Sequence, residues 1–153
     1  MSIRALIGGV ISALGGDPSL QGLAVTYAYP PSPAARPLAS PALCAGLEEL
    51  ALESGFGADA VGRRAKVRLR LELFTPAKSG AAEGVRLLPA VAQAALTLSG
   101  AASLSAGEAR YAGELDAFAL PVRLDLAAVL GPDEDSGIAF GDVGEIEVTA
   151  EGR

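Results

Sequence analysis

The chain has 153 residues, 50% of them hydrophobic but only 5% aromatic, and a formal net charge of −6. Because contacts to phosphates need a basic surface, this acidic balance argues against a general or sequence-specific nucleic-acid-binding protein. With no His and a single Cys, the sequence excludes a Ser–His or Cys–His nucleophile, a histidine-ligated zinc and an internal disulfide. The length fits one domain, and we expect residues 1–153 to form it.

The first segment predicts a helix over about residues 2–14. Ser2 is a suitable N-cap, and the Gly15-Gly16 pair ends the segment. Its apolar residues recur at helical spacing and form one stripe: Ile3, Leu6, Ile7, Val10, Ile11 and Leu14. The apolar run is too short to cross a bilayer and lacks a signal-peptide cleavage site, so we expect no membrane association and assembly in the cytoplasm.

A strand with one buried face is predicted over residues 23–29, where larger apolar side chains alternate with small or polar ones. Pro30 and Pro31 end this strand. The segment that follows contains Pro33 and cannot form a ladder or a helix interior, so we expect an extended arm. Such an arm is either a plain connection or a contact with a neighbouring subunit, which makes Pro30, Pro31 and Pro33 candidate interface residues.

Residues 41–53 carry conflicting signals. Ser40-Pro41 resembles a helix start, and Leu43, Leu47 and Leu50 have helical spacing, so propensity alone favours a helix. As a strand the segment needs a change of phase near Gly46, which a β-bulge supplies.

The clearest strand is predicted over residues 65–73. Apolar side chains occupy one face, and the opposite face carries the basic stripe, which we define as Lys66, Arg68 and Arg70. The simplest interpretation of the stripe is a solvated sheet face, paired across strands with Asp125, Glu108, Glu145 and Glu147. The functional interpretation is an interface with an acidic surface of another subunit, or a passage for DNA.

The second half of the chain predicts one more helix and several strands. Residues 82–99 form a broad apolar helical face, in which Pro89 marks either a kink or a start near Leu88. A weaker strand over 102–111 and a long strand over about 118–129 are expected to form a hairpin. An acidic loop at 133–135 and a last strand over 145–149 follow. Ile146 and Val148 of that strand are candidate interface residues, because a terminal edge strand can extend a neighbouring sheet.

This order of elements indicates an α+β protein with a mainly antiparallel sheet and two helices packed on one face. Little chemistry is available to it. We expect Cys44 to be a buried side chain, and the acidic loop lacks the spacing of a calcium-binding loop. We therefore expect no enzyme activity, no cofactor and no metal site.

Several short motifs are spread along residues 1–130. A strand ends in Tyr29-Pro30, and a later alternating strand ends in Phe74 and Pro76. Between them lie Pro37, Leu38 and Pro41 ahead of a Gly-Leu-Glu segment at 46–48, and Arg110-Tyr111 comes in the closing hairpin. In this order of segments and motifs the chain resembles the tail terminators and related tail-completion proteins of tailed bacteriophages and prophage-derived tail-like particles. Residues 131–153, the acidic loop and C-terminal strand, lie outside the resemblance.

The resemblance implies a ring, commonly six-fold, that terminates the tail tube and joins it to the neck of a virion or tail-like particle assembled in the bacterial cytoplasm. Its partners would be further copies of the chain, tube and neck proteins, and DNA passing through the ring. It also implies a strand rather than a helix over 42–52, and we adopt that prediction. The alternative from another class is a small cytoplasmic adaptor or chaperone-type module that binds a peptide or lipid.

Overall fold

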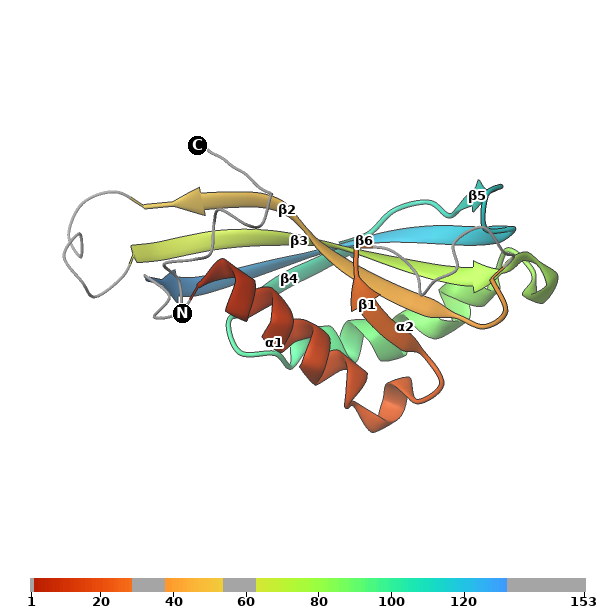
Figure 1. Cartoon of the computed structure of the whole chain (residues 1–153), viewed down its shortest axis with the longest axis horizontal. Coiled ribbons are helices and arrows are strands. Elements are labelled where there is room, and N and C mark those ends of the chain that lie inside the picture. The colour runs from red at the N-terminus through yellow and green to blue at the C-terminus, as the bar shows by residue number, and fades with distance from the viewer. Residues whose placement is uncertain (1, 29–37, 54–62, 132–153) are drawn as a thin grey trace.

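The computed structural model describes residues 2–28, 38–53 and 63–131 (Figure 1). In chain order the elements are α1 (Ile3–Gly15), η1 (Pro18–Leu20), β1 (Ala24–Tyr27), β2 (Ala42–Leu52), β3 (Arg63–Pro76), η2 (Ala77–Ser79), α2 (Glu83–Leu96), β4 (Ala101–Ala106), β5 (Arg110–Ala112) and β6 (Ala117–Leu130). Within the described residues this is the α+β architecture that the sequence predicts, with both α-helices on the same side of the sheet (Figure 1).

One twisted sheet organises the molecule. Its strand order is β1-β2-β3-β6-β4, and β5 also pairs with β6. β3 and β6 have 14 residues each and pair antiparallel along their whole length, so they form the long central ribbon in Figure 1. β1 pairs parallel with β2, and the remaining described pairs are antiparallel. The mainly antiparallel sheet is therefore confirmed.

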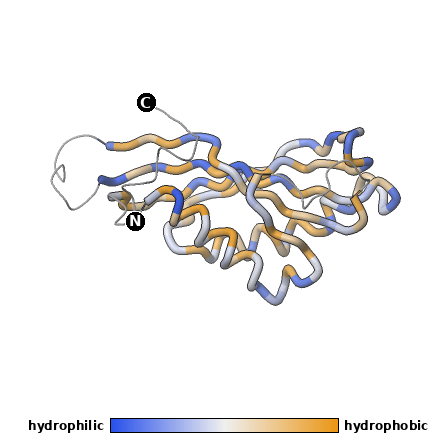
Figure 2. The backbone as a smooth tube through the Cα atoms, in the orientation of Figure 1, coloured by the Kyte–Doolittle hydropathy of each residue, from blue (hydrophilic) through white to orange (hydrophobic). Residues whose placement is uncertain are grey.

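The core lies between the helices and one face of this ribbon. Period-two alternation places the apolar side chains of β3 and β6 on that face, and α1 and α2 cover it with their own stripes. Hydrophobic stretches in Figure 2 accordingly line the helices and the strands above them. The largest fully buried aliphatic side chains among the described residues are Leu14, Leu43, Leu69, Leu71, Leu73, Leu124, Val67, Val91 and Val122. Each such burial stabilises the fold by about 1.5–3 kcal/mol.

The ends of α1 follow from local chemistry. The Ser2 hydroxyl accepts a hydrogen bond from the backbone N–H of Ala5 at 3.0 Å, as expected of an N-cap. The helix ends at Gly15, and the N–H of Gly16 donates to the carbonyl oxygen of Ser12. The helix predicted over 2–14 is thus confirmed to within a residue at each end.

Residues 42–52 form a strand, which confirms the prediction adopted from the resemblance, and the helix favoured by local propensity is wrong. β2 pairs antiparallel with β3 from Ala42 to Leu52, with a register shift between Leu47 and Glu49. This bulge supplies the expected change of phase and keeps the leucines on the side of the sheet that faces the helices. The alternating partner strand β3 provides a ladder of hydrogen bonds that outweighs a weak helix preference.

Two predicted boundaries change in the second half. α2 begins at Glu83 and continues through Pro89, so a start near Leu88 is wrong. The single weak strand predicted over 102–111 is two short strands, β4 and β5, separated by residues 107–109. Gly100 enters β4 at φ 84°, where an added Cβ would lie 2.3 Å from the carbonyl oxygen of Ala127, so only glycine fits this close approach.

Candidate interaction surface

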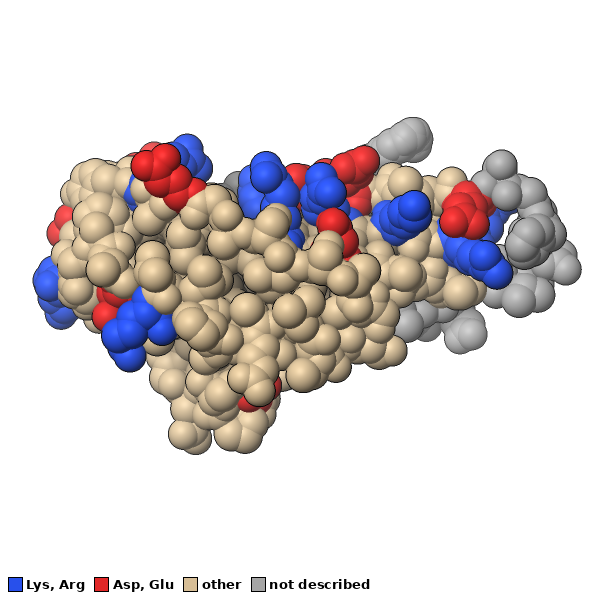
Figure 3. Space-filling model, turned by 180° about the vertical axis from the view of Figure 1, so that it is seen from behind, with Lys and Arg blue, Asp and Glu red and all other residues tan. Residues whose placement is uncertain are grey.

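The basic stripe lies on the sheet face that points away from the helices, as predicted. On this charged face β3 contributes Lys66, Arg68 and Arg70, and β6 contributes Arg123 and Asp125. Figure 3 shows a row of acidic and basic side chains along the sheet side of the molecule, with further charged side chains at one end of it. Both described α-helices pack on the opposite face of the sheet (Figure 1).

The three cations of the stripe are not equivalent. The Nε of Arg68 donates to Oδ1 of Asp125 at 2.8 Å, and its NH1 lies 3.7 Å from a carboxylate oxygen of Glu49. The hydrogen bond to Asp125 raises the pKa of Arg68, and the same bond lowers the pKa of Asp125. Ser103 on β4 also donates to Asp125 at 3.2 Å. Arg68 therefore belongs to the cross-strand network that the simpler interpretation expects.

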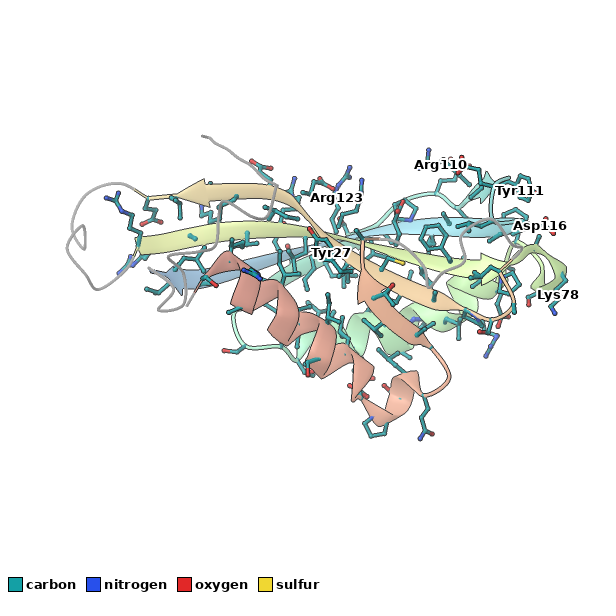
Figure 4. All side chains as sticks on the ribbon, viewed as in Figure 1. Tyr27, Lys78, Arg110, Tyr111, Asp116 and Arg123 are labelled. Carbon is teal, nitrogen blue, oxygen red and sulfur yellow. The ribbon has the colours of Figure 1, made fainter. Side chains whose placement is uncertain are left out.

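Lys66 and Arg70 make no ion pair within the part of the chain that the structure describes. Arg70 stands directly opposite Arg123 in the β3–β6 register, and like charges in that position repel. Arg123 instead donates to Glu48 at 2.8 Å (Figure 4 labels Arg123). Among the described residues, Lys66 and Arg70 are thus the members of the stripe whose charges are not compensated by an ion pair.

The other predicted interface residues cannot be placed on this surface. Pro30, Pro31 and Pro33, with the proposed arm, lie outside the described residues, as do Ile146 and Val148 of the predicted terminal strand. Two suggested partners of the stripe, Glu145 and Glu147, lie outside them as well. Glu108 is described but makes no ion pair with the stripe in the described part of the chain.

Sequence reasoning missed an exposed apolar edge. β1 pairs with β2 only from Ala42 to Ala45, and along residues 47–52 β2 has a described neighbour on the β3 side alone. We call residues 47–52 the open edge of β2. Its leucines are Leu47, Leu50 and Leu52, which are 43%, 37% and 53% exposed. The sequence shows the change of phase at Glu48-Glu49, where the bulge lies. It does not show that β2 lacks a second neighbouring strand along residues 47–52, because strand neighbours are set by the tertiary structure.

The β5–β6 hairpin forms a polar tip at the far end of the sheet (Figure 4). The hydroxyl of Tyr111 donates to Asp116 at 2.7 Å, and its ring contacts Phe118 edge-on at 5.6 Å between centroids. The hydrogen bond raises the pKa of Tyr111, which is 58% exposed. Arg110 and Lys78 are further polar groups at this end of the molecule. These contacts hold the hairpin together, and they bring no nucleophile beside a base.

A shallow groove of about 190 Å³ separates η1 from α2. Its apolar lining includes Leu20, Leu23, Leu87 and Val91, and its polar rim includes Glu83 and Arg86, which pair at 2.6 Å. Sites for small molecules are typically about 300–1,000 Å³, so the groove is small for a lipid or a drug-sized ligand.

Two further observations concern the chemical groups of the described residues. Within residues 2–28, 38–53 and 63–131 no three His, Cys, Asp or Glu side chains come together as a metal site would require. Cys44 is buried, and desolvation raises the pKa of its thiol, which disfavours the reactive thiolate. Among the helices described, none is long and apolar enough to cross a membrane.

Comparison with solved structures shows a likeness in fold. A chain of the structure described as the virion of a native gene transfer agent particle matches with a TM-score of 0.50 and 21% sequence identity. The match covers 82% of this chain and 93% of that chain, so the two share a fold over most of their length. No family model matches the sequence, and no curated protein matches it.

Proposed function

We propose that this chain is a structural subunit of a phage-like particle, assembling as a ring that ends the tail tube and joins it to the neck. The observation that carries the proposal is the shared fold. A chain of a gene transfer agent virion is matched over 93% of its length, at a TM-score of 0.50. The short sequence motifs along residues 1–130 that resemble tail terminators add support, because they do not depend on the comparison of folds.

The geometry suits a subunit held by its surfaces. Ring subunits contact one neighbour on each side, and such contacts need uncovered area on both sides of the fold. The described residues offer an open charged face and an open strand edge. Lys66 and Arg70 are available to an acidic surface of the next subunit or to DNA passing through the ring. The function proposed here involves no catalysis, and the described residues of the charged face hold no acid–base constellation that would call for one.

The adaptor or chaperone-type alternative has weaker support. It requires a pocket or groove that holds a peptide or a lipid. The groove between η1 and α2 is the relevant candidate, and its volume of about 190 Å³ is below that of ordinary ligand sites. An adaptor would also be absent from finished particles, and this difference separates the two functions experimentally.

The test is deletion of the gene from the genome that encodes the particle, followed by electron microscopy and mass spectrometry of purified particles. If the protein is a terminator, its deletion should leave tails of irregular length that are not joined to heads. Gold labelling should locate the wild-type protein at the head–tail junction of normal particles. Normal particles after deletion, or particles that lack the protein, would contradict the proposal.

Complementation then tests the charged face. Lys66→Glu with Arg70→Glu should fold normally but fail to restore joined particles, because both side chains are free of ion pairs in the described structure. Lys78→Glu, an exposed cation on η2, is the matched control and should restore them. Reversal of Arg68 is avoided, because a Glu there would stand beside Asp125 and Glu49 and unsettle the sheet itself.

A further inference from the structure

We propose that the open edge of β2 pairs with β4 of a second copy of this chain, so that the sheets of neighbouring subunits continue into one another. This inference rests on the proposed ring and names the contact that would build it. A strand edge carries a row of backbone N–H and C=O groups, and native proteins usually protect such edges with Lys, Pro or a covering element. The open edge of β2 instead carries three exposed leucines.

The two edges are matched in length and in level. The open edge spans the six exposed residues of β2, and β4 also has six residues. In the registers across the sheet, Ala101 faces Leu126, which faces Val67, which faces Leu50. The two edges therefore lie at the same level on opposite sides of the sheet, so that one lateral step can bring β4 of one copy alongside β2 of the next.

The side chains match face by face. Leu47, Leu50 and Leu52 share the helix side of the sheet, because their partners on β3 are core residues. On the β4 edge the same side offers Leu104, partly buried against the core, and Leu96 at the end of α2, which is 47% exposed. A continuous sheet keeps its faces, so these apolar side chains would cover one another.

Charge favours unlike edges over like ones. Glu48 and Glu49 are paired with Arg123 and Arg68 of the same copy, and Glu53 adds a further negative charge at the end of the β2 edge. Two such edges placed together would bring carboxylates of like charge close to one another, which is unfavourable. The sequence of β4, Ala-Ala-Ser-Leu-Ser-Ala, carries no charge, and Ser103 and Ser105 lie on the polar face opposite Asp125 and Arg123. Pairing of β2 with β4 is a head-to-tail contact, which closes into a ring when its rotation permits.

The test uses two complementary edge variants of the full chain. Leu50→Lys spoils the β2 edge, and Ala102→Lys with Ala106→Lys spoils the β4 edge, since lysines on an edge block strand addition. Light scattering over a concentration series is expected to show each variant as a monomer. Their mixture is expected to give one-to-one dimers and nothing larger, because one intact edge of each kind remains.

Three controls distinguish loss of β2–β4 pairing from unfolding, from a general effect of an added lysine, and from a contact made by the C-terminal segment. Val85→Lys changes an exposed apolar residue of α2, 58% exposed, and should assemble as wild type does. Urea unfolding should show that every variant is folded. Removal of residues 132–153 should leave assembly intact. If the truncated chain fails to assemble while both edge variants assemble normally, the contact between subunits is made by residues 132–153, and the proposal is overturned.

The remaining outcomes are equally decisive. Dimers formed by the β4 variant alone would indicate like pairing of two β2 edges and contradict the proposal. A wild-type chain that stays monomeric throughout the series would also overturn it, while the particle-deletion experiment would still decide the proposed function. Open filaments with the expected behaviour of the variants would support the edge pairing and count against a ring.

Discussion

The two halves of β2 are one continuous strand, paired with β3 along its length, and yet they are buried very differently. Residues 42–46 are buried, with Leu43 at 0% exposure, whereas residues 47–52 are exposed, with Leu52 at 53%. Both leucines face the same side of the sheet. The first half has β1 as a second neighbour and lies in the region covered by the helices, and the second half has β3 as its sole described neighbour.

This difference shows that hydrophobic content does not fix what a strand does. Leucine in the first half stabilises the monomer by leaving water on folding. Leucine in the second half keeps much of its contact with water, so its burial is still available to association. A single strand thus combines a structural half and an interaction half, and the bulge between Leu47 and Glu49 lies where the two meet.

The largest expected effect is a difference in the free energy of unfolding between substitutions in the two halves of β2. Leu43→Ala should lower the free energy of unfolding by about 2–5 kcal/mol, because it empties a fully buried site. Leu52→Ala should lower it by less than about 1 kcal/mol in the monomer, since the side chain is already half in water. Urea denaturation of the dilute protein measures both, and equal losses would show that the second half is covered after all.

Hydrogen exchange should show the same division without mutation. Amides of residues 42–46 are flanked by β1 and β3, so they should open with a free energy near the global value. Amides of residues 47–52 that point away from β3 should exchange far faster in the monomer and become protected on assembly. Uniform protection along β2 in the dilute protein would contradict an open edge.

The smallest expected effect concerns the ion pairs beside the second half. The hydrogen bond from Arg68 holds the pKa of Asp125 below its ordinary value of 3.8. The resulting stabilisation is present above that value and is lost as the pH falls through the lower pKa of the folded state. Asp125→Asn should flatten this part of the pH dependence of the urea midpoint. Glu114→Gln, an exposed carboxylate on the 113–116 turn, should leave the profile unchanged.

Much of the fold could be predicted from local patterns. The stripe of α1 and its Ser2 cap, the alternation of β3, and the charged side chains on the opposite face all follow from spacing, because each depends on a period of 3.6 or 2 residues. The pairing of Arg68 with Asp125 was among the expected cross-strand partners. The division of residues 102–111 into β4 and β5 was not predicted. No residue before Gly107 indicates that the pairing with β6 is interrupted at residues 107–109.

The sequence by itself determined the fold class, the aliphatic core face and the stripe of Lys66, Arg68 and Arg70. The conflict over residues 42–52 was decided for a strand only by the resemblance, and the structure confirms that strand. Only the tertiary structure decided that Arg68 is paired while Lys66 and Arg70 make no ion pair among the described residues, and that residues 47–52 of β2 have no described neighbour beyond β3. The physical reason is the range of the interactions. Periodicity reports the neighbours of a residue along its own element, whereas pairing and exposure depend on strands that lie far away in the sequence and adjacent in space.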